Sequence, residues 1–232
     1  MNYAAIKKTD VANGPGIRVS LFVSGCTHHC RGCFNSETWD FGYGQPYTAE
    51  TEEEILQALS PDYIRGLSLL GGEPMEPANR GTVLSLIQKV RQRYPGKDIW
   101  CYTGYDYEKD LLQWMAREKP VRNPEREDSA LTGGAQREPI CTAKGEKSAG
   151  ACHEDGGTNR QGSEKGEEAC VEETETGQIA QLLSLIDVLV DGKFQEERKN
   201  LRLAFRGSEN QRLIDVKESL RQGRTVCLPD IS

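Results

Sequence analysis

The stretch IRVSLFVSGCTHHCRGCFNSETW (residues 17–39) joins a β-branched segment to a loop that holds three cysteines. Residues 17–23 alternate partly between apolar and polar side chains, which predicts the first strand of a sheet. Cys26, Cys30 and Cys33 follow, with His28 and His29 between the first two. Their spacing leaves three interpretations of the loop: a zinc site, a disulfide-bonded knot, or the ligands of an iron–sulfur cluster.

The redox state of the cysteines and the number of ligands that each metal site needs rank these three alternatives. The first ten residues, MNYAAIKKTD, lack the apolar run of a signal peptide, and cysteines in a reducing compartment are thiols or metal ligands. Structural zinc takes four ligands, here three cysteines and one histidine, but a second C-x-x-C is missing from the sequence. A cubane cluster takes one thiolate per iron. Three thiolates would leave one iron open to a non-protein ligand, and the spacing favours this cluster.

The remaining pattern predicts an α/β fold with a mostly parallel sheet, because apolar strand segments alternate with helical ones. We expect helices over 48–59 with Thr48 as the N-cap, from Asn79 as the cap through Arg93, and over 107–116 and 179–186. Further strands are expected at 67–70, 98–104 and 187–190, and irregular structure with another strand over 201–216.

Each predicted parallel strand is followed by a distinctive loop. The cysteine loop follows residues 17–23, GGEP (71–74) follows the next strand, and TGY (103–105) and DGK (191–193) follow the two after that. In parallel βα folds the chemistry gathers at the carboxyl ends of the strands. We therefore expect all four loops at one rim.

Composition separates residues 121–177 from the rest. This segment has no aromatic residue and carries 13 acidic and 7 basic residues, a net charge of −6 out of −7 for the chain. Such a stretch cannot bury enough apolar surface to fold, so we predict a disordered acidic insertion between 1–120 and 178–232. The segment also contains three cysteines and one histidine, which we interpret as incidental rather than as an extra metal site. They are Cys141, Cys152, Cys170 and His153.

Bulk properties exclude several function classes. A net charge of −7 and a pI near 5.2 argue against a nucleic-acid binder or an anionic-membrane binder. No apolar run approaches the ~18 residues that span a bilayer. We expect a soluble cytoplasmic protein.

Taken together, the motifs resemble a known family. C-x3-C-x2-C after the first strand and GGE after the second are similar to the radical S-adenosylmethionine (SAM) superfamily. The segments DVANGPGIRVSLFVSGC, CRGCFNSETWDF, LLGGEP, YTGYDYE, DVLVDGKF and RGSENQRLIDV resemble the activating proteins of anaerobic ribonucleoside-triphosphate reductases. The resemblance covers residues 10–118 and 178–216. It implies a partial, incomplete parallel βα barrel of radical SAM type, interrupted by the long disordered insertion.

The resemblance also implies roles for individual residues. Cys26, Cys30 and Cys33 would hold a [4Fe-4S] cluster. The contacts to SAM would come from the residues that flank the last cysteine and from the GGE and D-x-K elements: Gly32, Cys33, Phe34, Gly71, Gly72, Glu73, Asp191 and Lys193. His28 and His29 are interpreted as plain loop residues, and Arg18 as part of a structural turn rather than a partner contact.

The activity that the resemblance implies is installation of a glycyl radical. The reduced cluster would cleave SAM, and a hydrogen atom would be taken from a glycine of the large subunit of the reductase. An electron donor such as flavodoxin is implied as a second partner, and the family suggests a homodimer. Two alternatives stay open. The protein could be an activase of another glycyl-radical enzyme or a small radical SAM peptide modifier, or it could be a zinc-binding interaction module without enzymatic activity.

Overall fold

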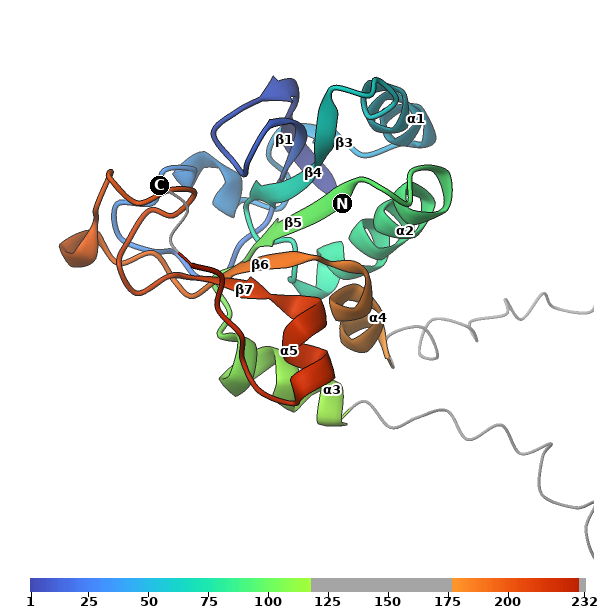
Figure 1. Ribbon diagram of the computed structural model, residues 1–232. Coiled ribbons are helices and arrows are strands. Elements are labelled where there is room, and N and C mark those ends of the chain that lie inside the picture. Colours follow the sequence, from blue (N-terminus) through green and yellow to red (C-terminus); the bar gives the residue numbers. More distant parts are fainter. Residues whose placement is uncertain (118–176, 230–232) are drawn as a thin grey trace, which may run out of the picture. The chain divides into compact units, whose positions relative to one another are not determined.

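The computed structural model describes residues 1–117 and 177–229 of the chain. They form a mixed α/β unit around a seven-stranded sheet with the order β3-β1-β2-β4-β5-β6-β7 (Figure 1). The predicted insertion, with Cys141, Cys152, His153 and Cys170, lies outside the described residues except for Gly177. Its disorder and the division into domains therefore stay predictions.

The centre of the sheet is parallel, as the sequence predicts. Four neighbouring strands run in the same direction: β2 (Ile17–Val23), β4 (Ile64–Gly71), β5 (Asp98–Tyr102) and β6 (Val188–Asp191). The outer strands are antiparallel to their neighbours: β1 (Asn2–Asp10), β3 (Gln45–Pro46) and β7 (Arg212–Asp215). The fold is thus α/β with a parallel centre, and the partial barrel remains a proposal.

The prediction that residues 17–23 form the first strand is wrong, because β1 precedes them. β1 reads NYAAIKKTD, a segment with two alanines and two lysines and no clear period-2 pattern. It is a strand because it pairs antiparallel with the strongly β-prone β2, with irregular register between Tyr3 and Ala5 and between Lys7 and Asp10. Tertiary pairing here overrides a weak local preference.

The helices lie close to their predicted positions. The α-helices are α1 (Ala49–Ala58), α2 (Pro77–Arg93), α3 (Leu112–Arg117), α4 (Gln178–Leu185) and α5 (Val216–Gln222). A π-helical turn over Tyr107–Leu111 leads into α3, and short 3-10 turns lie at Ser36–Trp39 and Glu196–Arg198. Helix α5, which directly follows β7, was not predicted.

One of the two predicted helix caps is confirmed. Thr48 caps α1, since its hydroxyl accepts a hydrogen bond from the Thr51 N–H in a capping box. The prediction that Asn79 caps α2 is wrong, because Pro77 already occupies the first turn, where its missing N–H and fixed φ are favourable. Asn79 is instead buried, and its amide donates to the carbonyls of Ser24 and Glu73.

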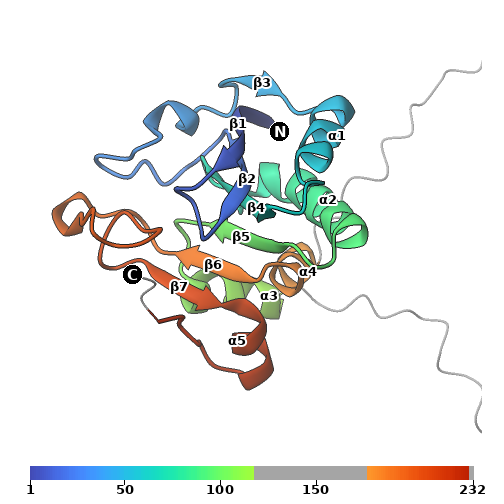
Figure 2. The same cartoon turned by 45° about the horizontal axis from the view of Figure 1, so that its top comes forward.

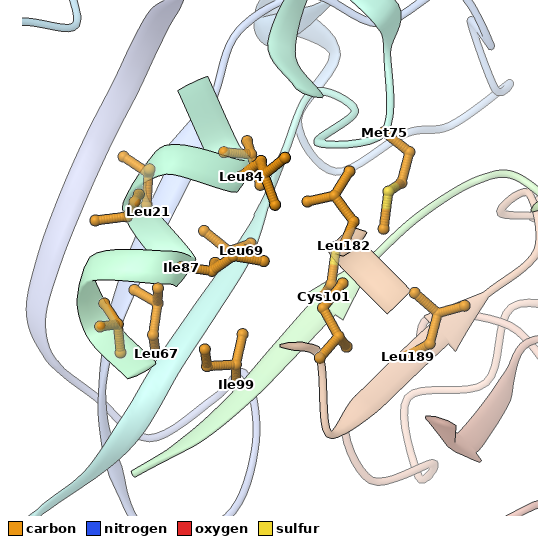
Figure 3. Close-up of a cluster of buried hydrophobic side chains, with 14 of the residues drawn as sticks. Leu21, Leu67, Leu69, Met75, Leu84, Ile87, Ile99, Cys101, Leu182 and Leu189 are labelled. Atoms are coloured by element: carbon orange, nitrogen blue, oxygen red, sulfur yellow. The ribbon is translucent and has the colours of Figure 1, made fainter. Parts of the chain in front are cut away.

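One face of the sheet packs against helices. Alternate strand residues such as Leu67, Leu69, Ile99 and Cys101 point to the same side and meet Leu84, Ile87 and Leu182 from α2 and α4 (Figure 3). These side chains form the main hydrophobic core, which holds the parallel strands and so the ends of their loops in place.

The other face carries the intervening side chains. Trp100, Val188, Val190 and Leu213 form a second, smaller cluster against Phe205 and Leu228. The cysteine loop and the chain that follows β6 lie at the strand ends toward which the β5 and β6 arrowheads point, away from α1, α2 and α4 (Figure 2). The loops with distinctive motifs are therefore free to meet there.

Across the described ranges, the structure contains no helix with both the length and the apolar character needed to cross a membrane.

Candidate cofactor site at the strand ends

The four loops predicted to share a rim line one cavity of about 620 Å³. β2, β4, β5 and β6 are parallel, so their carboxyl ends meet at one edge of the sheet. The loop residues that line the cavity are Cys26, His28, Cys30, Cys33, Phe34, Asn35, Gly71, Gly72, Glu73, Thr103, Gly104 and Gly192. A cavity of this volume is in the range that takes a cofactor-sized ligand.

The cysteine loop is closed at its base by backbone hydrogen bonds. The Gly25 N–H donates to the Thr38 carbonyl at 2.8 Å, and the Cys26 N–H donates to the Trp39 carbonyl at 3.1 Å. Gly25 has φ +95, and a Cβ there would lie 2.2 Å from the Phe41 ring. Only glycine fits this position, so both arms of the loop lie close together.

The three cysteines face the cavity as free thiols in different environments. Cys26 is buried, and this burial raises its pKa to about 11. Cys30 and Cys33 are half-buried, and burial followed by the nearby Cys33 thiol raises the pKa of Cys30. Because the thiolate is the metal ligand, loading this site releases protons.

The three thiols are not gathered as the ligands of a single zinc ion would be. Four ligands at Zn–S distances of 2.3 Å around a tetrahedral ion lie about 3.8 Å apart. Within residues 1–117 and 177–229, the three sulfurs do not belong to any set of ligand atoms that all lie within 4.8 Å of one another. Within the described ranges, the cysteines and the histidines between them thus form no closed set of ligands for one ion, and the donor set at the cavity is three thiols.

The two glycines of GGEP allow the cysteine loop to approach β4. Gly71 has φ +104, and a Cβ there would lie 2.8 Å from the Val23 carbonyl oxygen. A Cβ on Gly72 would lie 2.6 Å from the carbonyl oxygen of Gly25. The Gly72 N–H also donates to Val23 O at 2.7 Å. Gly71 and Gly72 therefore bring the cluster loop and the GGE loop against each other.

Glu73 joins three loops of the rim. Its side chain is 1% exposed. One carboxylate oxygen accepts from the Met75 N–H at 2.8 Å, and the other accepts from the Gly104 N–H at 2.7 Å and lies 3.0 Å from His28 Nε2. The predicted site residue is thus present at the cavity, and most of its acceptor capacity is used within the chain.

The two residues that flank Cys33 differ in position. Phe34 is 55% exposed, lines the cavity, packs on Phe194 at 5.1 Å between ring centroids, and lies under the Lys199 ammonium. Gly32, with φ +69, faces outward, where a Cβ would lie 2.9 Å from the Glu196 carboxylate, and it is not among the lining residues. Phe34 and Cys33 therefore line the cavity, whereas Gly32 lies outside its lining.

The two charged residues of the D-x-K element, Asp191 and Lys193, also differ in position. Asp191 is fully buried, and its carboxylate accepts from the Tyr107 N–H at 2.9 Å and from the Arg212 guanidinium. Its side chain is therefore engaged away from the cavity, whereas the neighbouring Gly192 lines it. Lys193 is exposed, and its positive charge acts to lower the pKa of Cys30.

Three features of the site were missed at the level of sequence. His28, interpreted as a plain loop residue, bonds to Glu73. The segment after β6 contributes an apolar wall of Phe194, Leu201, Leu203 and Phe205. Tyr102, the last residue of β5, also lines the cavity. A tyrosine directly before TGY was the only available signal.

Two orphaned polar atoms test whether the cavity fits a cofactor with polar groups. The Tyr102 hydroxyl and the Trp39 ring N–H are buried and have no hydrogen-bond partner among the described residues, and both residues line the cavity. Buried polar groups are nearly always satisfied. Both residues border the cavity beside the three thiols, and a bound group with polar atoms would give these two atoms the partners that they lack.

Comparison with known proteins agrees with the donor set. A family model described as a 4Fe-4S single cluster domain matches residues 12–122 and 167–214. The chain is 33% identical over 213 residues to the anaerobic ribonucleoside-triphosphate reductase-activating protein of Escherichia coli (strain K12), with 91% of this chain and 96% of that protein covered.

Shorter matches to proteins of the same name are closer in sequence. Identity is 52% over 107 residues with the Vibrio cholerae protein, covering 45% of this chain and 69% of that protein. It is 49% over 113 residues with the protein of Enterobacteria phage T4, covering 49% and 72%. The three-thiol loop, the cluster-domain match and the full-length likeness lead to one assignment: the chain belongs to the family of anaerobic ribonucleoside-triphosphate reductase-activating proteins.

Proposed function

We propose that this protein is a radical SAM activase that installs a glycyl radical on an anaerobic ribonucleotide reductase. The observation that carries the proposal is the meeting of three thiols and the GGE loop in one cavity, in a chain whose relatives are named for activating that reductase. The cluster of the matched family supports the iron–sulfur part, and the cavity's orphaned polar groups support the nucleoside part.

Cys26, Cys30 and Cys33 would hold a [4Fe-4S] cluster and leave its fourth iron to SAM. When bound, the pair supplies reductive cleavage of SAM and abstraction of a hydrogen atom from a glycine. The chain's contribution is orientation. Phe34 would cover the nucleoside with its ring, and Gly71 and Gly72 would let the ligand approach the backbone as closely as the cysteine loop does.

The remaining proposed SAM contacts act in different ways. Glu73 keeps one lone pair of the oxygen that accepts from Met75, and this oxygen would meet the methionine amine. Lys193, exposed near Cys30, would meet the carboxylate. Gly32 and Asp191 would act through their neighbours, Gly32 by turning the chain between Cys30 and Cys33, and Asp191 by anchoring Gly192 at the cavity.

The apolar wall and exposed Phe34 support the entry of a peptide from the partner. Leu201 is 78% exposed at the cavity and offers an apolar contact to a glycine-containing segment of the reductase. No general acid or base is needed for hydrogen-atom transfer, and a glycine has no side chain to hinder it. An electron donor such as flavodoxin, a homodimer and a cytoplasmic location complete the proposal.

Anaerobic reconstitution with iron and sulfide tests the function. We expect a brown protein that forms deoxyadenosine from SAM under dithionite and generates a glycyl radical on the co-purified reductase, detected by electron paramagnetic resonance (EPR). Cys30→Ala should abolish both products, while Cys227→Ala, at an exposed cysteine outside the cavity, should keep them. A colourless protein with one bound zinc would refute the activase and support an interaction module.

A radical formed only on a different glycyl-radical protein would overturn the choice of partner. In that case SAM cleavage would persist while the reductase stayed radical-free, so the chemistry and the partner are tested separately.

A further inference from the structure

Two residues inside the cysteine loop bond to the loop that follows β4. Thr27 donates from its N–H at 2.9 Å and from its hydroxyl at 2.5 Å to the same oxygen of Glu76. The next residue, His28, lies 3.0 Å from Glu73 through Nε2. Adjacent residues of one loop therefore contact two carboxylates that are themselves three residues apart and buried.

The His28 ring is enclosed. Its side chain is 5% exposed, its ring lies edge-on to Tyr105 at 4.4 Å between centroids, and its other side faces Gly104. An ionised carboxylate can only accept hydrogen bonds, so the tautomer with the proton on Nε2 donates to Glu73 beside the Gly104 N–H. His28 thus links the cysteine loop to both the β4–α2 loop and the loop after β5.

The contacts of Thr27 and His28 lie where they can orient the cysteine thiols. Thr27 and His28 directly follow Cys26 and lie between it and Cys30, so fixing them fixes the direction in which the first two thiols leave the sheet. Glu73 and Glu76 lie directly before α2, with Glu76 as its N-cap residue, and the core holds this helix in place. Buried hydrogen bonds to a charged group are among the stronger ones, and they orient their partners geometrically.

We propose that Thr27 and His28 are positioning residues that clamp the cysteine loop to the GGE loop. They keep the cluster ligands and the SAM-binding backbone in one rigid arrangement before either cofactor arrives. The inference rests on the proposed function and deepens it, because it assigns a task to the histidine of C-T-H-H-C. It also gives the Glu73 carboxylate three partners inside the chain, Met75, Gly104 and His28, so that one lone pair of the oxygen that accepts from Met75 remains for the methionine amine.

Hydrogen exchange of the metal-free protein tests the clamp without any cofactor. His28→Ala should speed exchange of backbone amides in residues 24–38 and 72–76 by about tenfold or more, since protection in a loop falls when its buried contacts are lost. His28→Gln, whose side-chain amide can donate to Glu73, should restore most of the protection. Arg31→Ala serves as the matched control, because Arg31 lies in the same loop with a side chain that is 93% exposed.

Thr27→Val provides a second variant in case His28→Ala fails to fold. It removes the hydroxyl donor, keeps the shape and the backbone N–H donor, and should raise exchange in the same two segments. Equal exchange in wild type, Thr27→Val and His28→Ala would overturn the clamp. So would equal protection in His28→Ala and His28→Gln, because the inference depends on a donor at this position.

The reconstituted protein gives a second readout. We expect His28→Ala to weaken SAM binding about tenfold, measured by the SAM-induced change in the cluster EPR signal, with rescue by His28→Gln. A wild-type protein that forms no cluster or shows no SAM-induced change would refute the proposed function, while the exchange result would still stand for or against the clamp. Unchanged SAM affinity in His28→Ala, beside a responsive wild type, would overturn the clamp alone.

Discussion

Gly104 lies so close to His28 that a Cβ on the glycine would fall 2.3 Å from the Cδ2 atom of the imidazole. The contact joins the loop after β5 to the cysteine loop. We expect Gly104→Ala to lower the free energy of unfolding by about 1–3 kcal/mol, because overpacking an enclosed site forces side chains or backbone to shift. Urea unfolding of the metal-free protein measures it. Gly96→Ala is the control, since a Cβ on Gly96 meets nothing within 4 Å, and equal midpoints for the two variants would contradict the prediction.

The buried guanidinium of Arg18 is a structural element. Its side chain is fully buried, Nε donates to Ser68 Oγ at 2.7 Å, and Nη1 lies 2.6 Å from Asp98 Oδ1. Arg18→Met should destabilise the protein by about 3–5 kcal/mol, because it leaves buried acceptors without their donor. Arg65→Met removes a 65% exposed partner of the same aspartate and should cost at most about 1 kcal/mol. Similar losses in thermal unfolding for both would contradict the structural role of Arg18.

The ion pair between Arg212 and Glu108 predicts a pH dependence of stability. The hydrogen bond from the Arg212 guanidinium, at 2.6 Å, lowers the pKa of Glu108 from 4.5 to about 2. A carboxylate with a depressed pKa contributes stability that is present above its unfolded-state pKa near 4.5 and is lost as the pH falls toward 2. Wild type and Glu108→Gln should therefore differ most in urea midpoint near neutral pH and converge below pH 4.5. A gap that stays constant over this range would exclude the pair as its cause.

A charge-matched variant separates this effect from general acid unfolding. Glu197 is exposed on the 3-10 turn Glu196–Arg198. Glu197→Gln removes the same charge, and its midpoint should follow wild type across the whole pH range.

Tyr102 predicts a split between stability and ligand binding. Burial raises the pKa of Tyr102, and its hydroxyl has no partner among the described residues although it lies at the cavity. Tyr102→Phe should leave the melting temperature of the metal-free protein unchanged or slightly raised. A lost hydrogen bond of about 0.5–1.5 kcal/mol should weaken SAM binding roughly 2- to 12-fold in the reconstituted protein. Unaltered SAM affinity would show that the hydroxyl does not serve the ligand.

Deletion of residues 121–177 tests the predicted insertion. We expect the shortened protein, joined by a Gly/Ser linker, to take up the cluster and to cleave SAM nearly as well as the full chain, because all proposed cofactor residues lie outside the segment. Deoxyadenosine formation per cluster measures this. A loss of cleavage with the cluster still present would show that the segment takes part in the reaction.

The rim was predictable from sequence because motif and strand are neighbours along the chain. GGEP directly follows an apolar strand, and parallel strands place such loops together whatever their exact registers. β1 was not predictable, because its alanines and lysines carry no strand pattern and its pairing with β2 decides its conformation.

The contacts between the rim loops could not be predicted from the sequence, because their partners lie far apart along the chain. His28 and Glu73 lie 45 residues apart, and only the approach allowed by Gly72 and Gly104 brings them together. Asp191 shows the converse. Its motif suggested a ligand contact, yet Arg212, a residue 21 positions later, engages its carboxylate. Local patterns can indicate that a residue matters without showing which partner it meets.

The half-burial of Cys30 and Cys33 has a consequence for how the protein would work in a cell. A cluster held by Cys26 and these two thiols would have two of its three protein ligands near the surface, on the side from which a redox protein could dock. Electrons would then enter from outside without crossing the hydrophobic core. The same shallow position would admit dioxygen, which destroys such clusters, so the architecture suits a catalyst that operates only where air is absent.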